Sequence, residues 1–333
     1  MNEEFPLVDL EQFRRDDAAR MRVASAIDRA CRTSGFFLVT GHGIDPSLIR
    51  RMREVTHAFF TMPLEEKLRY RHGDEIGCVG YAPMKEFALD AAALPDLSEG
   101  FNITSPDIPA AAAEAPALAR TFFRGNVWPD APADFRHTWE KFYRAASALG
   151  RELMSACAVA LRLPASHFES ALDHEISHLT CKFYPEQPEP PPPGQFRAAP
   201  HTDFGALTLL LTERRPGGLE VLDPDGRWRP VDAPEDTFIA NLGDLMAQWT
   251  NDLWRSTVHR VVNPPPAAGT QARRLSLVFF QQPNHDALIE CLPGCRSADR
   301  PARHARTTSG EHYYRKLADM RRPGRNAGPA PAG

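Results

Sequence analysis

The sequence predicts an α+β, mainly β fold in which helices of the first half buttress a double-sheet jelly roll or small barrel in the second half. Two observations lead to this prediction. Up to about residue 178, apolar residues recur at helical spacing, and beyond it short segments rich in β-branched and aromatic residues follow one another between turn residues. Many short strands without long helices between them are typical of jelly rolls and barrels.

Size and charge narrow the class of protein. The 333 residues are 42% hydrophobic and 25% charged, which is enough to bury a large core in one compact unit. The net charge of -4 argues against a nucleic-acid binder, because phosphate neutralisation needs a basic face. No apolar run approaches the roughly 20 residues that span a bilayer, and the first residues lack a leader pattern. We expect a cytoplasmic protein with a small-molecule substrate and no nucleic-acid or membrane partner, and the oligomeric state stays open.

The cysteines indicate free thiols rather than a disulfide framework or a zinc ribbon. All six are thinly spread and form no repeated pair. Cys291 and Cys295, the one close pair, flank Leu-Pro-Gly, and we interpret them as two incidental cysteines beside a turn. We assign no site to them.

The first half mixes extended and helical segments. Residues 36–39 form an apolar run closed by Gly41, His42 and Gly43, which is the pattern of a buried strand. We expect a surface loop at 106–116, where alanine, proline and acidic residues gather. The other predicted elements are an extended segment at 5–10, a helix at 16–33 with Met21, Ala24, Ile27 and Ala30 on one face, a helix at 46–60, and a long helix or helical pair at 132–163 with Leu149, Leu153, Cys157 and Leu161 on one face.

The second half reads as a series of strands. We expect strands at 178–184, 206–212, 219–222, 228–231, 237–241, 256–262 and 274–280. The proline-rich residues 185–200 predict a stiff extended connection. We expect it to act as a lid beside the candidate site that follows it in the sequence, around residue 201. We expect a helix at about 310–317 to close over the substrate pocket, and the Arg-, Pro- and Gly-rich residues 321–333 predict a disordered tail.

His201, Asp203 and His259 point to a metal. If the chain is extended around Ala199-Pro200-His201-Thr202-Asp203, residues two apart share a face, so one imidazole and one carboxylate converge. His259 lies in another predicted strand. Two histidines and one carboxylate form the facial triad of non-haem iron(II) oxygenases, with three positions left for a bidentate 2-oxo acid and dioxygen. A single His-x-Asp in a chain with 12 histidines is weak evidence for a metal site. The interpretation therefore depends on the residues described next.

Arg274, Ser276 and Tyr184 supply donors for a carboxylate. Arg274 and Ser276 lie two apart on a predicted strand, so both face the interior of the barrel, where a guanidinium group and a hydroxyl suit a carboxylate. A buried arginine requires such a partner. Tyr184 ends the strand that precedes the His-x-Asp segment. Each of these residues alone is weak evidence for a carboxylate-binding site. Their order in the sequence around His201, Asp203 and His259 makes that evidence stronger.

A series of different short motifs follows a fixed order along nearly the whole chain. They are residues 5–10, 35–43, 59–60, 63–67 and 80–81 in the first half, then Tyr184-Pro185, His201-Thr202-Asp203, Asn241-Leu242-Gly243-Asp244, His259-Arg260-Val261 and Arg274-x-Ser276. On these motifs the chain resembles the isopenicillin N synthase-like family of iron(II)- and 2-oxoglutarate-dependent oxygenases.

The resemblance implies a distorted double-stranded β-helix, a cupin-like jelly roll. It implies that His201, Asp203 and His259 bind Fe(II) and act in catalysis, and that Arg274 and Ser276 hold the far carboxylate of 2-oxoglutarate. Tyr184 matches a tyrosine that some members use for this co-substrate. Lys182 stands where several plant members have asparagine, which puts that contact in doubt. The Asn241-to-Asp244 motif is expected to shape a turn.

The same resemblance divides the chain into four parts. Residues 1–120 correspond to an N-terminal mixed region of the non-haem dioxygenase type, and 175–285 to the Fe(II)/2-oxoglutarate jelly-roll core. Residues 286–320 form a C-terminal closing segment, followed by the tail at 321–333.

The implied reaction uses Fe(II), 2-oxoglutarate and O2 to oxidise a small organic molecule, with hydroxylation as the expected outcome and release of succinate and CO2. Expected wall residues are Phe204, Met246 and Phe279 or Phe280. Residues 251–265 and 283–285 resemble the branch that contains thymine hydroxylases. Three alternatives stay open: a 2-oxoglutarate-independent oxidase of the isopenicillin N synthase type, a non-catalytic binding protein on the same barrel, and a zinc hydrolase, which would have no need of Arg274-x-Ser276.

Overall fold

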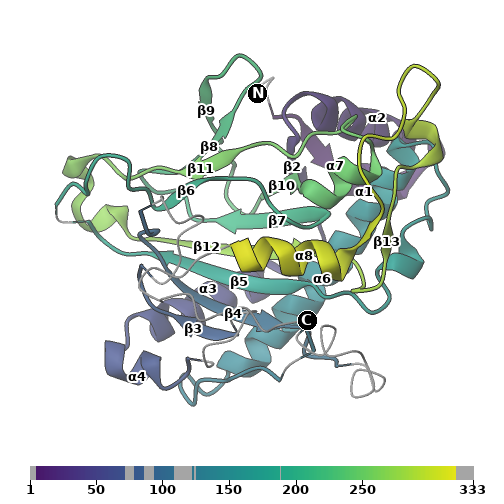
Figure 1. Cartoon of the computed structure of the whole chain (residues 1–333). Helices are drawn as coiled ribbons and strands as arrows, with labels where there is room; N and C mark the ends of the chain where they lie inside the picture. The colour runs from purple at the N-terminus through teal and green to yellow at the C-terminus, as the bar shows by residue number, and fades with distance from the viewer. Residues whose placement is uncertain are drawn as a thin grey trace, which may run out of the picture.

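The computed structural model describes residues 5–71, 79–85, 94–108, 122–123, 125–187 and 189–319 (Figure 1). Two sheets form the walls of a jelly roll. The larger runs in the order β1 (Leu7–Asp9), β2 (Phe36–Thr40), β10 (Phe238–Leu242), β7 (Leu207–Thr212), β12 (Arg274–Gln281), β5 (His178–Tyr184), β4 (Glu99–Thr104) and β3 (Gly80–Ala82). The smaller runs in the order β6 (Ala198–His201), β11 (His259–Val261), β8 (Leu219–Leu222) and β9 (Trp228–Pro230).

Helices cover the outer face of the large sheet and the ends of the barrel. They are α1 (Leu10–Arg15), α2 (Asp17–Thr33), α3 (Pro46–Phe60), α4 (Leu64–Leu68), α6 (Phe135–Ala160), α7 (Asp244–Trp249) and α8 (Ser309–Asp319). Short 3-10 turns at Glu169–Ala171, Pro266–Ala272 and Pro293–Cys295 and a small hairpin of β13 (Leu288–Ile289) and β14 (Thr307–Thr308) complete the described elements. None of these helices is long and apolar enough to cross a membrane.

The helix boundaries follow local capping. The side chain of Asp45 accepts a hydrogen bond from the Ser47 amide and Pro46 takes the first helical position, so α3 begins where the sequence predicts. Asp16 caps α2 in the same way. The predicted face of α2 is wrong at Met21, which is 52% exposed, while the other three predicted positions are buried. Within the predicted range 132–163 the structure has one helix, α6 (Phe135–Ala160), rather than a pair.

The strand predictions agree with the structure to different degrees. The predicted strands at 178–184 and 219–222 agree with β5 and β8 at both ends. The strand predicted at 256–262 is wrong in length, because only His259–Val261 pairs with its neighbours. The five described cysteines are free thiols, as predicted, and Cys78 lies outside the described residues. The predicted tail and most of the loop predicted at 106–116 lie outside them too.

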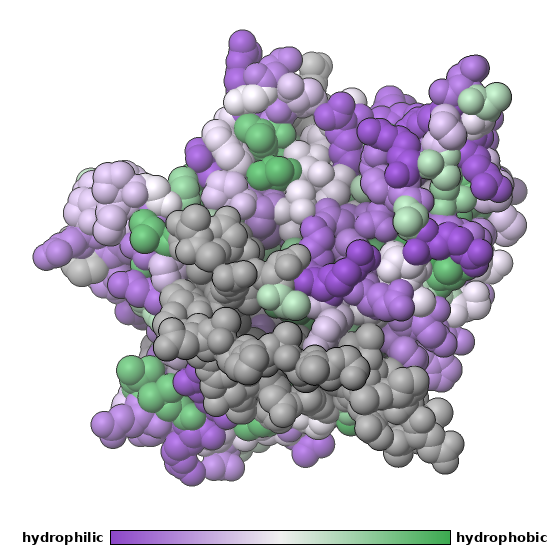
Figure 2. Space-filling model, in the orientation of Figure 1, coloured by the Kyte–Doolittle hydropathy of each residue, from purple (hydrophilic) through white to green (hydrophobic). Residues whose placement is uncertain are grey.

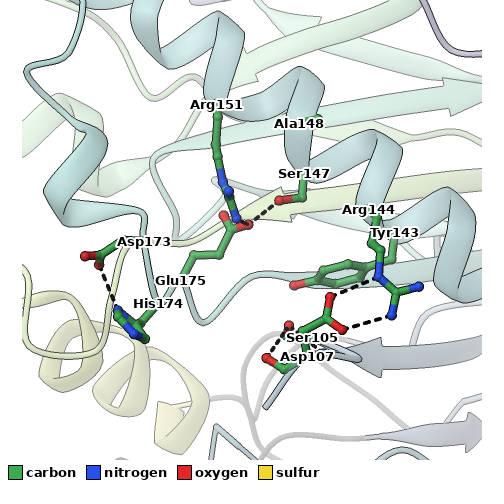
Figure 3. Close-up of a pocket in the computed structure, with 10 residues that line it drawn as sticks. All are labelled: Ser105, Asp107, Tyr143, Arg144, Ser147, Ala148, Arg151, Asp173, His174 and Glu175. Atoms are coloured by element: carbon green, nitrogen blue, oxygen red, sulfur yellow. Dashed lines mark hydrogen bonds and ion pairs between the residues drawn. The ribbon is translucent and has the colours of Figure 1, made fainter. Parts of the chain in front are cut away.

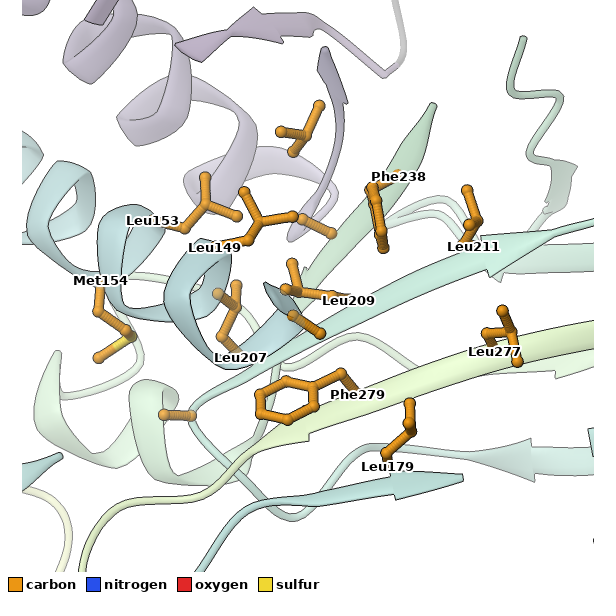
Figure 4. Close-up of a cluster of buried hydrophobic side chains, with 14 of the residues drawn as sticks. Leu149, Leu153, Met154, Leu179, Leu207, Leu209, Leu211, Phe238, Leu277 and Phe279 are labelled. Atoms are coloured by element: carbon orange, nitrogen blue, oxygen red, sulfur yellow. The ribbon is translucent and has the colours of Figure 1, made fainter. Parts of the chain in front are cut away.

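Alternate residues of the central strands face two different environments. In β7, β12 and β5 one set packs against α6 and the other helices in the main core, as Leu209, Phe279 and Leu179 do in Figure 4. The opposite set faces the space between the two sheets. A second apolar cluster, with Phe36, Val221 and others, fills one end of that space. The polar side chains Asp203, Thr208, Asn241, Arg274 and Ser276 are also buried there.

The C-terminal closing segment is held by two residues that follow α7. Asn251 is fully buried and its amide donates to the carbonyls of Cys295 and Pro301. Asp252 bonds to His304. Beyond this anchor, α8 lies across β7, β12 and β5 in the view of Figure 1.

On the face drawn in Figure 2 the described residues show small apolar areas scattered among hydrophilic ones.

Gly150 of α6 tests how tightly this helix packs on the sheet. A Cβ there would overlap Oε1 of Gln281, a fully buried side chain held by Glu175. We expect Gly150→Ala to lower the free energy of unfolding by about 1–3 kcal/mol, the usual cost of overpacking, although alanine is the better helix former. Urea unfolding measures this change. Gly294→Ala is the control, because apart from its chain neighbours no atom of the described residues lies within 4 Å of its added Cβ. A Gly150→Ala protein as stable as wild type would contradict the contact.

Candidate metal and co-substrate site

Three predicted ligands meet between the two sheets. His201 ends β6, Asp203 follows it in the next turn, and His259 begins β11, where it pairs directly with His201. Their ligand atoms all lie within 4.8 Å of one another. Oδ1 of Asp203 is 3.8 Å from Nε2 of His201 and 3.7 Å from Nε2 of His259. In the described part of the chain this is the one group of such side chains with metal-binding spacing.

Backbone carbonyls orient both imidazoles. Nδ1 of His201 lies 2.7 Å from the carbonyl oxygen of Ala199, and Nδ1 of His259 lies 3.0 Å from that of Thr257. A carbonyl oxygen only accepts, so each Nδ1 carries the proton and each Nε2 keeps a lone pair. This arrangement is the usual one for metal-binding histidines. The donor set of two imidazole nitrogens and one carboxylate oxygen therefore fits Fe(II).

The two oxygens of Asp203 have different surroundings. Oδ2 accepts hydrogen bonds from Oγ1 of Thr208 at 2.6 Å and from Nδ2 of Asn241 at 2.7 Å. Oδ1 faces the histidines. Asn241 thus supports a metal ligand from within β10, whereas its motif was predicted to shape a turn. Thr208 was missed, although it is a polar residue on the inward face of an otherwise apolar strand, and that pattern could have identified it.

Burial and neighbouring charge set the protonation states here. Burial raises the pKa of the Asp203 carboxyl, but the two imidazoles and the hydrogen bonds from Thr208 and Asn241 outweigh it, so the pKa ends below its ordinary value. Burial, with a contribution from His201, lowers the pKa of His259 to about 4. At neutral pH the carboxylate is charged and this imidazole is neutral, which are the forms that bind a metal.

Arg274, Ser276 and Tyr184 gather toward the other end of β12 and β5. Arg274 and Tyr184 are direct partners in the register of these strands, and the guanidinium carbon lies 5.8 Å from the tyrosine ring centre. Nε of Arg274 donates to Oγ1 of Thr212 at 2.8 Å, and the Ser276 hydroxyl lies 2.9 Å from the same oxygen. All three predicted residues are buried. Burial lowers the pKa of Arg274 and raises the pKa of Tyr184 to about 12.

The predicted wall residues divide into two groups. Phe279 and Met246 belong to the main core and face the helices. Phe280 is on the inward face of β12, where it stacks on His178 with ring centres 4.7 Å apart. Tyr313 of α8 lies 5.7 Å from the His178 ring. Successive side chains of a strand point to opposite faces of the sheet, which explains why Phe280 rather than Phe279 lines the interior.

Phe204 joins the same aromatic group from the turn after Asp203. Its ring lies 6.3 Å from that of Tyr313. Lys182 is half-buried on the inward face of β5, directly opposite Ser276 and Gly100. Neither His178 nor Tyr313 was predicted from the sequence.

A cleft of about 250 Å3 opens beside α6, and none of the predicted metal or co-substrate residues lines it (Figure 3). Arg144 binds Asp107 through two hydrogen bonds, and Arg151 pairs with the buried Glu175 at 3.1 Å. Ser147 and Ser177 also donate to Glu175. Both arginines are thus paired with carboxylates of the protein itself, and we interpret the cleft as a structural junction between α6 and the start of β5.

The fold and the site together define a non-haem iron oxygenase, and comparison with known proteins identifies the family. Residues 5–131 match the family model described as non-haem dioxygenase in morphine synthesis N-terminal, and residues 175–283 match the 2OG-Fe(II) oxygenase superfamily. Homoarginine-6-hydroxylase of Oryza sativa subsp. japonica is 32% identical over 91% of this chain and 90% of its own. Validamycin A dioxygenase of Streptomyces hygroscopicus subsp. limoneus is 32% identical over 95% and 86%.

Solved structures agree with this result. A full-length Neurospora crassa protein crystallised in complex with alpha-KG superposes with a TM-score of 0.82 and 31% identity, covering 94% of this chain and 96% of that one. Another structure of the same Neurospora crassa protein contains alpha-KG and thymine. The chain belongs to the 2OG-Fe(II) oxygenase superfamily. It is a non-haem iron, 2-oxoglutarate-dependent dioxygenase that acts on a small molecule, and the isopenicillin N synthase-like resemblance is confirmed.

Thr208 provides a test of how Asp203 is held. Replacing its hydroxyl by a methyl group in Thr208→Val leaves Oδ2 of Asp203 with one hydrogen bond instead of two. We expect Fe(II) affinity to fall roughly 10- to 100-fold, as when other outer partners of metal ligands are removed. Anaerobic metal titration measures the dissociation constant. Thr56→Val is the control, because the hydroxyl of Thr56 is buried without a partner among the described residues. Equal Fe(II) affinity in both variants would contradict this role.

The pKa of His178 leads to a prediction of how the stability of the metal-free protein depends on pH. Burial lowers its pKa from the usual 6.5 to about 4. Between these values the unfolded chain binds a proton at this imidazole and the folded protein does not, so the free energy of unfolding falls as the pH drops through this window. Urea unfolding above and within the window measures the fall. We expect it to be shallower in His178→Phe, and an unchanged pH dependence would contradict a neutral His178.

Proposed function

We propose that His201, Asp203 and His259 hold the catalytic Fe(II) and that Arg274, Ser276 and Tyr184 bind the far carboxylate of 2-oxoglutarate. The observation that supports this most directly is the orientation of the three ligand atoms. Both Nε2 atoms and Oδ1 of Asp203 face a common point, while their other polar atoms are occupied by the protein. A hydrolytic zinc centre would need the same ligands but not the buried donors on β12.

The arrangement along β12 supports the co-substrate assignment. Ser276 and Phe280 pair with Thr212 and Thr208 of β7, so the carboxylate donors and the support of Asp203 lie on one continuous inward face. Four residues along a strand span roughly 13 Å. A short dicarboxylic acid anchored at Arg274 and Ser276 would lie on this face with its other end directed toward the triad. Arg274 supplies a charge-assisted hydrogen bond, and the hydroxyl of Ser276 fixes its direction.

The protein's own residues orient the reactants and exclude water. When bound, the iron would couple the reduction of O2 to the oxidative decarboxylation of 2-oxoglutarate, which gives succinate and CO2, and to oxidation of the substrate. Thr208 and Asn241 keep Asp203 ionised and fix which oxygen faces the metal. The aromatic side chains of His178, Phe280 and Tyr313 form an apolar wall that keeps bulk water from the reacting groups.

We propose hydroxylation of a small organic molecule as the reaction. Two kinds of relative support this: homoarginine-6-hydroxylase by its name, and the Neurospora crassa protein by its complex with thymine. Phe204, His178, Phe280 and Tyr313 form the aromatic part of the substrate wall in this proposal. No nucleic-acid or membrane partner and a cytoplasmic location stay predictions from composition, and the oligomeric state is open.

The proposed division of the chain keeps the predicted boundaries. Residues 1–120 form the N-terminal region, 175–285 the catalytic jelly roll and 286–320 the segment that closes over the site. The anchoring of residues 295–304 by Asn251 and Asp252 supports a closing segment that is fixed at its start. The role of residues 185–200 as a lid stays a prediction.

Anaerobic addition of 2-oxoglutarate to the Fe(II)-loaded protein tests the two assignments. We expect the weak visible metal-to-ligand charge-transfer band in wild type, its loss in His259→Ala, and a higher 2-oxoglutarate requirement in Arg274→Ala. Arg214→Ala is the control, because Arg214 is an exposed arginine of the same region paired with Asp232. An unchanged band in His259→Ala would overturn the metal site. An Arg274→Ala protein that binds 2-oxoglutarate as wild type would overturn the co-substrate site.

A further inference from the structure

Arg197 is a fully buried arginine just before β6, and none of the roles assigned above involves it. Its side chain is 0% exposed. Nη2 donates to the carbonyl oxygens of Pro185 at 3.1 Å and Ala272 at 2.5 Å, and Nη1 donates to that of Pro216 at 3.4 Å. One guanidinium group thus joins three segments that are far apart in the sequence.

Each of these three segments carries a part of the proposed co-substrate site. Pro185 follows Tyr184, and Ala272 lies two residues before Arg274. Pro216 precedes Gly217, whose carbonyl oxygen accepts a hydrogen bond from Nη1 of Arg274. Arg197 therefore connects the segments whose relative positions decide where the donors of the pocket lie.

Arg197 also brings a second positive charge to the pocket. Its guanidinium carbon lies 5.5 Å from the centre of the Tyr184 ring, and that of Arg274 lies 5.8 Å from the same centre. Burial, together with the nearby charge of Arg274, lowers the pKa of Arg197 to about 10, so Arg197 is charged at neutral pH. Arginine side chains keep their proton in proteins, so Arg274 carries a charge too.

Neither guanidinium group is directly paired with a carboxylate in the part of the chain that the structure describes; the Glu213 carboxylate acts on Arg274 only through its charge. Among the described residues, Nε of Arg197 is buried without a hydrogen-bond partner. Two buried cations beside one ring are costly unless an anion compensates them. The site is therefore electrostatically prepared for an anion.

We propose that Arg197 is a positioning residue for the 2-oxo acid, which fixes the walls of the Arg274 pocket and adds the second positive charge that makes the pocket select an oxo acid with a second carboxylate. The proposal rests on the co-substrate site proposed above. A purely structural clamp would stabilise the fold without distinguishing a charged ligand from an uncharged one. Ligand selectivity therefore separates the two roles.

The test compares two ligands of equal chain length, 2-oxoglutarate and 2-oxopentanoate, which lacks the far carboxylate. Binding to the Fe(II)-loaded protein is measured anaerobically by titration calorimetry. Arg197→Met keeps most of the side-chain volume and removes the charge. We expect its dissociation constant for 2-oxoglutarate to rise roughly 10- to 100-fold, the range for a lost charge-assisted interaction, while that for 2-oxopentanoate changes little. Selectivity for the dicarboxylate then falls by the same factor.

Arg197→Lys keeps the charge but cannot reach three carbonyl oxygens at once. We expect it to retain most of the selectivity of wild type while its melting temperature falls. Wild-type selectivity in the lysine variant supports the charge role when a variant without the charge loses it. If Arg197→Met does not fold, Arg197→Gln is the variant without the charge. Loss of selectivity in a folded lysine variant overturns the charge role.

Two further proteins make the outcomes distinct. Arg53→Met is the matched control, since Arg53 is a partly buried arginine paired with Asp236 on the outer side of the fold, and it should bind both ligands as wild type does. An Arg197→Met protein that keeps wild-type selectivity, or that loses both ligands equally, overturns the proposal for Arg197. Unchanged 2-oxoglutarate binding in Arg274→Met instead overturns the co-substrate site itself.

Discussion

The structure depends on one buried carboxylate, that of Asp203, between the two sheets of the jelly roll. A buried charge must be compensated, and here the compensation comes from both walls. Thr208 and Asn241 of the large sheet bind Oδ2, while His201 and His259 of the small sheet face Oδ1. The carboxylate therefore links the sheets and at the same time leaves three ligand atoms directed at one point. A metal ion completes the compensation that the protein begins.

A complementary constraint operates at the other end of the same strands. Arg274 and Arg197 are buried beside Tyr184 without a paired carboxylate among the described residues, and their hydrogen bonds go to neutral oxygens. The interior thus contains an anionic end that is suited to a cation and a cationic end that is suited to an anion. The apolar clusters on both sides of the large sheet keep water away from these charged groups. Electrostatic interactions are stronger in such an interior than in water.

The sequence allowed much of this to be predicted wherever the signal was local. Pro46 gave the start of α3, which Asp45 caps in the structure, and segments rich in β-branched and aromatic residues between turns gave both ends of β5 and β8. Prediction failed where packing overrides the pattern. Met21 continues the apolar period of α2 but is exposed, and most of the strand predicted around His259 is loop, since its neighbours pair with only three residues.

By itself, the sequence determined the ligand types, the family motifs and the two-residue spacing that puts Arg274 and Ser276 on one face, because strand geometry is a local property. Only the tertiary structure decided that Thr208 and Asn241 hold Asp203, that His178 and Tyr313 lie together, and that Arg197 joins three distant segments. The physical reason is that these contacts depend on the register of non-adjacent strands and on loops with no period. A buried arginine in a loop has no sequence signal until the charges around it are known.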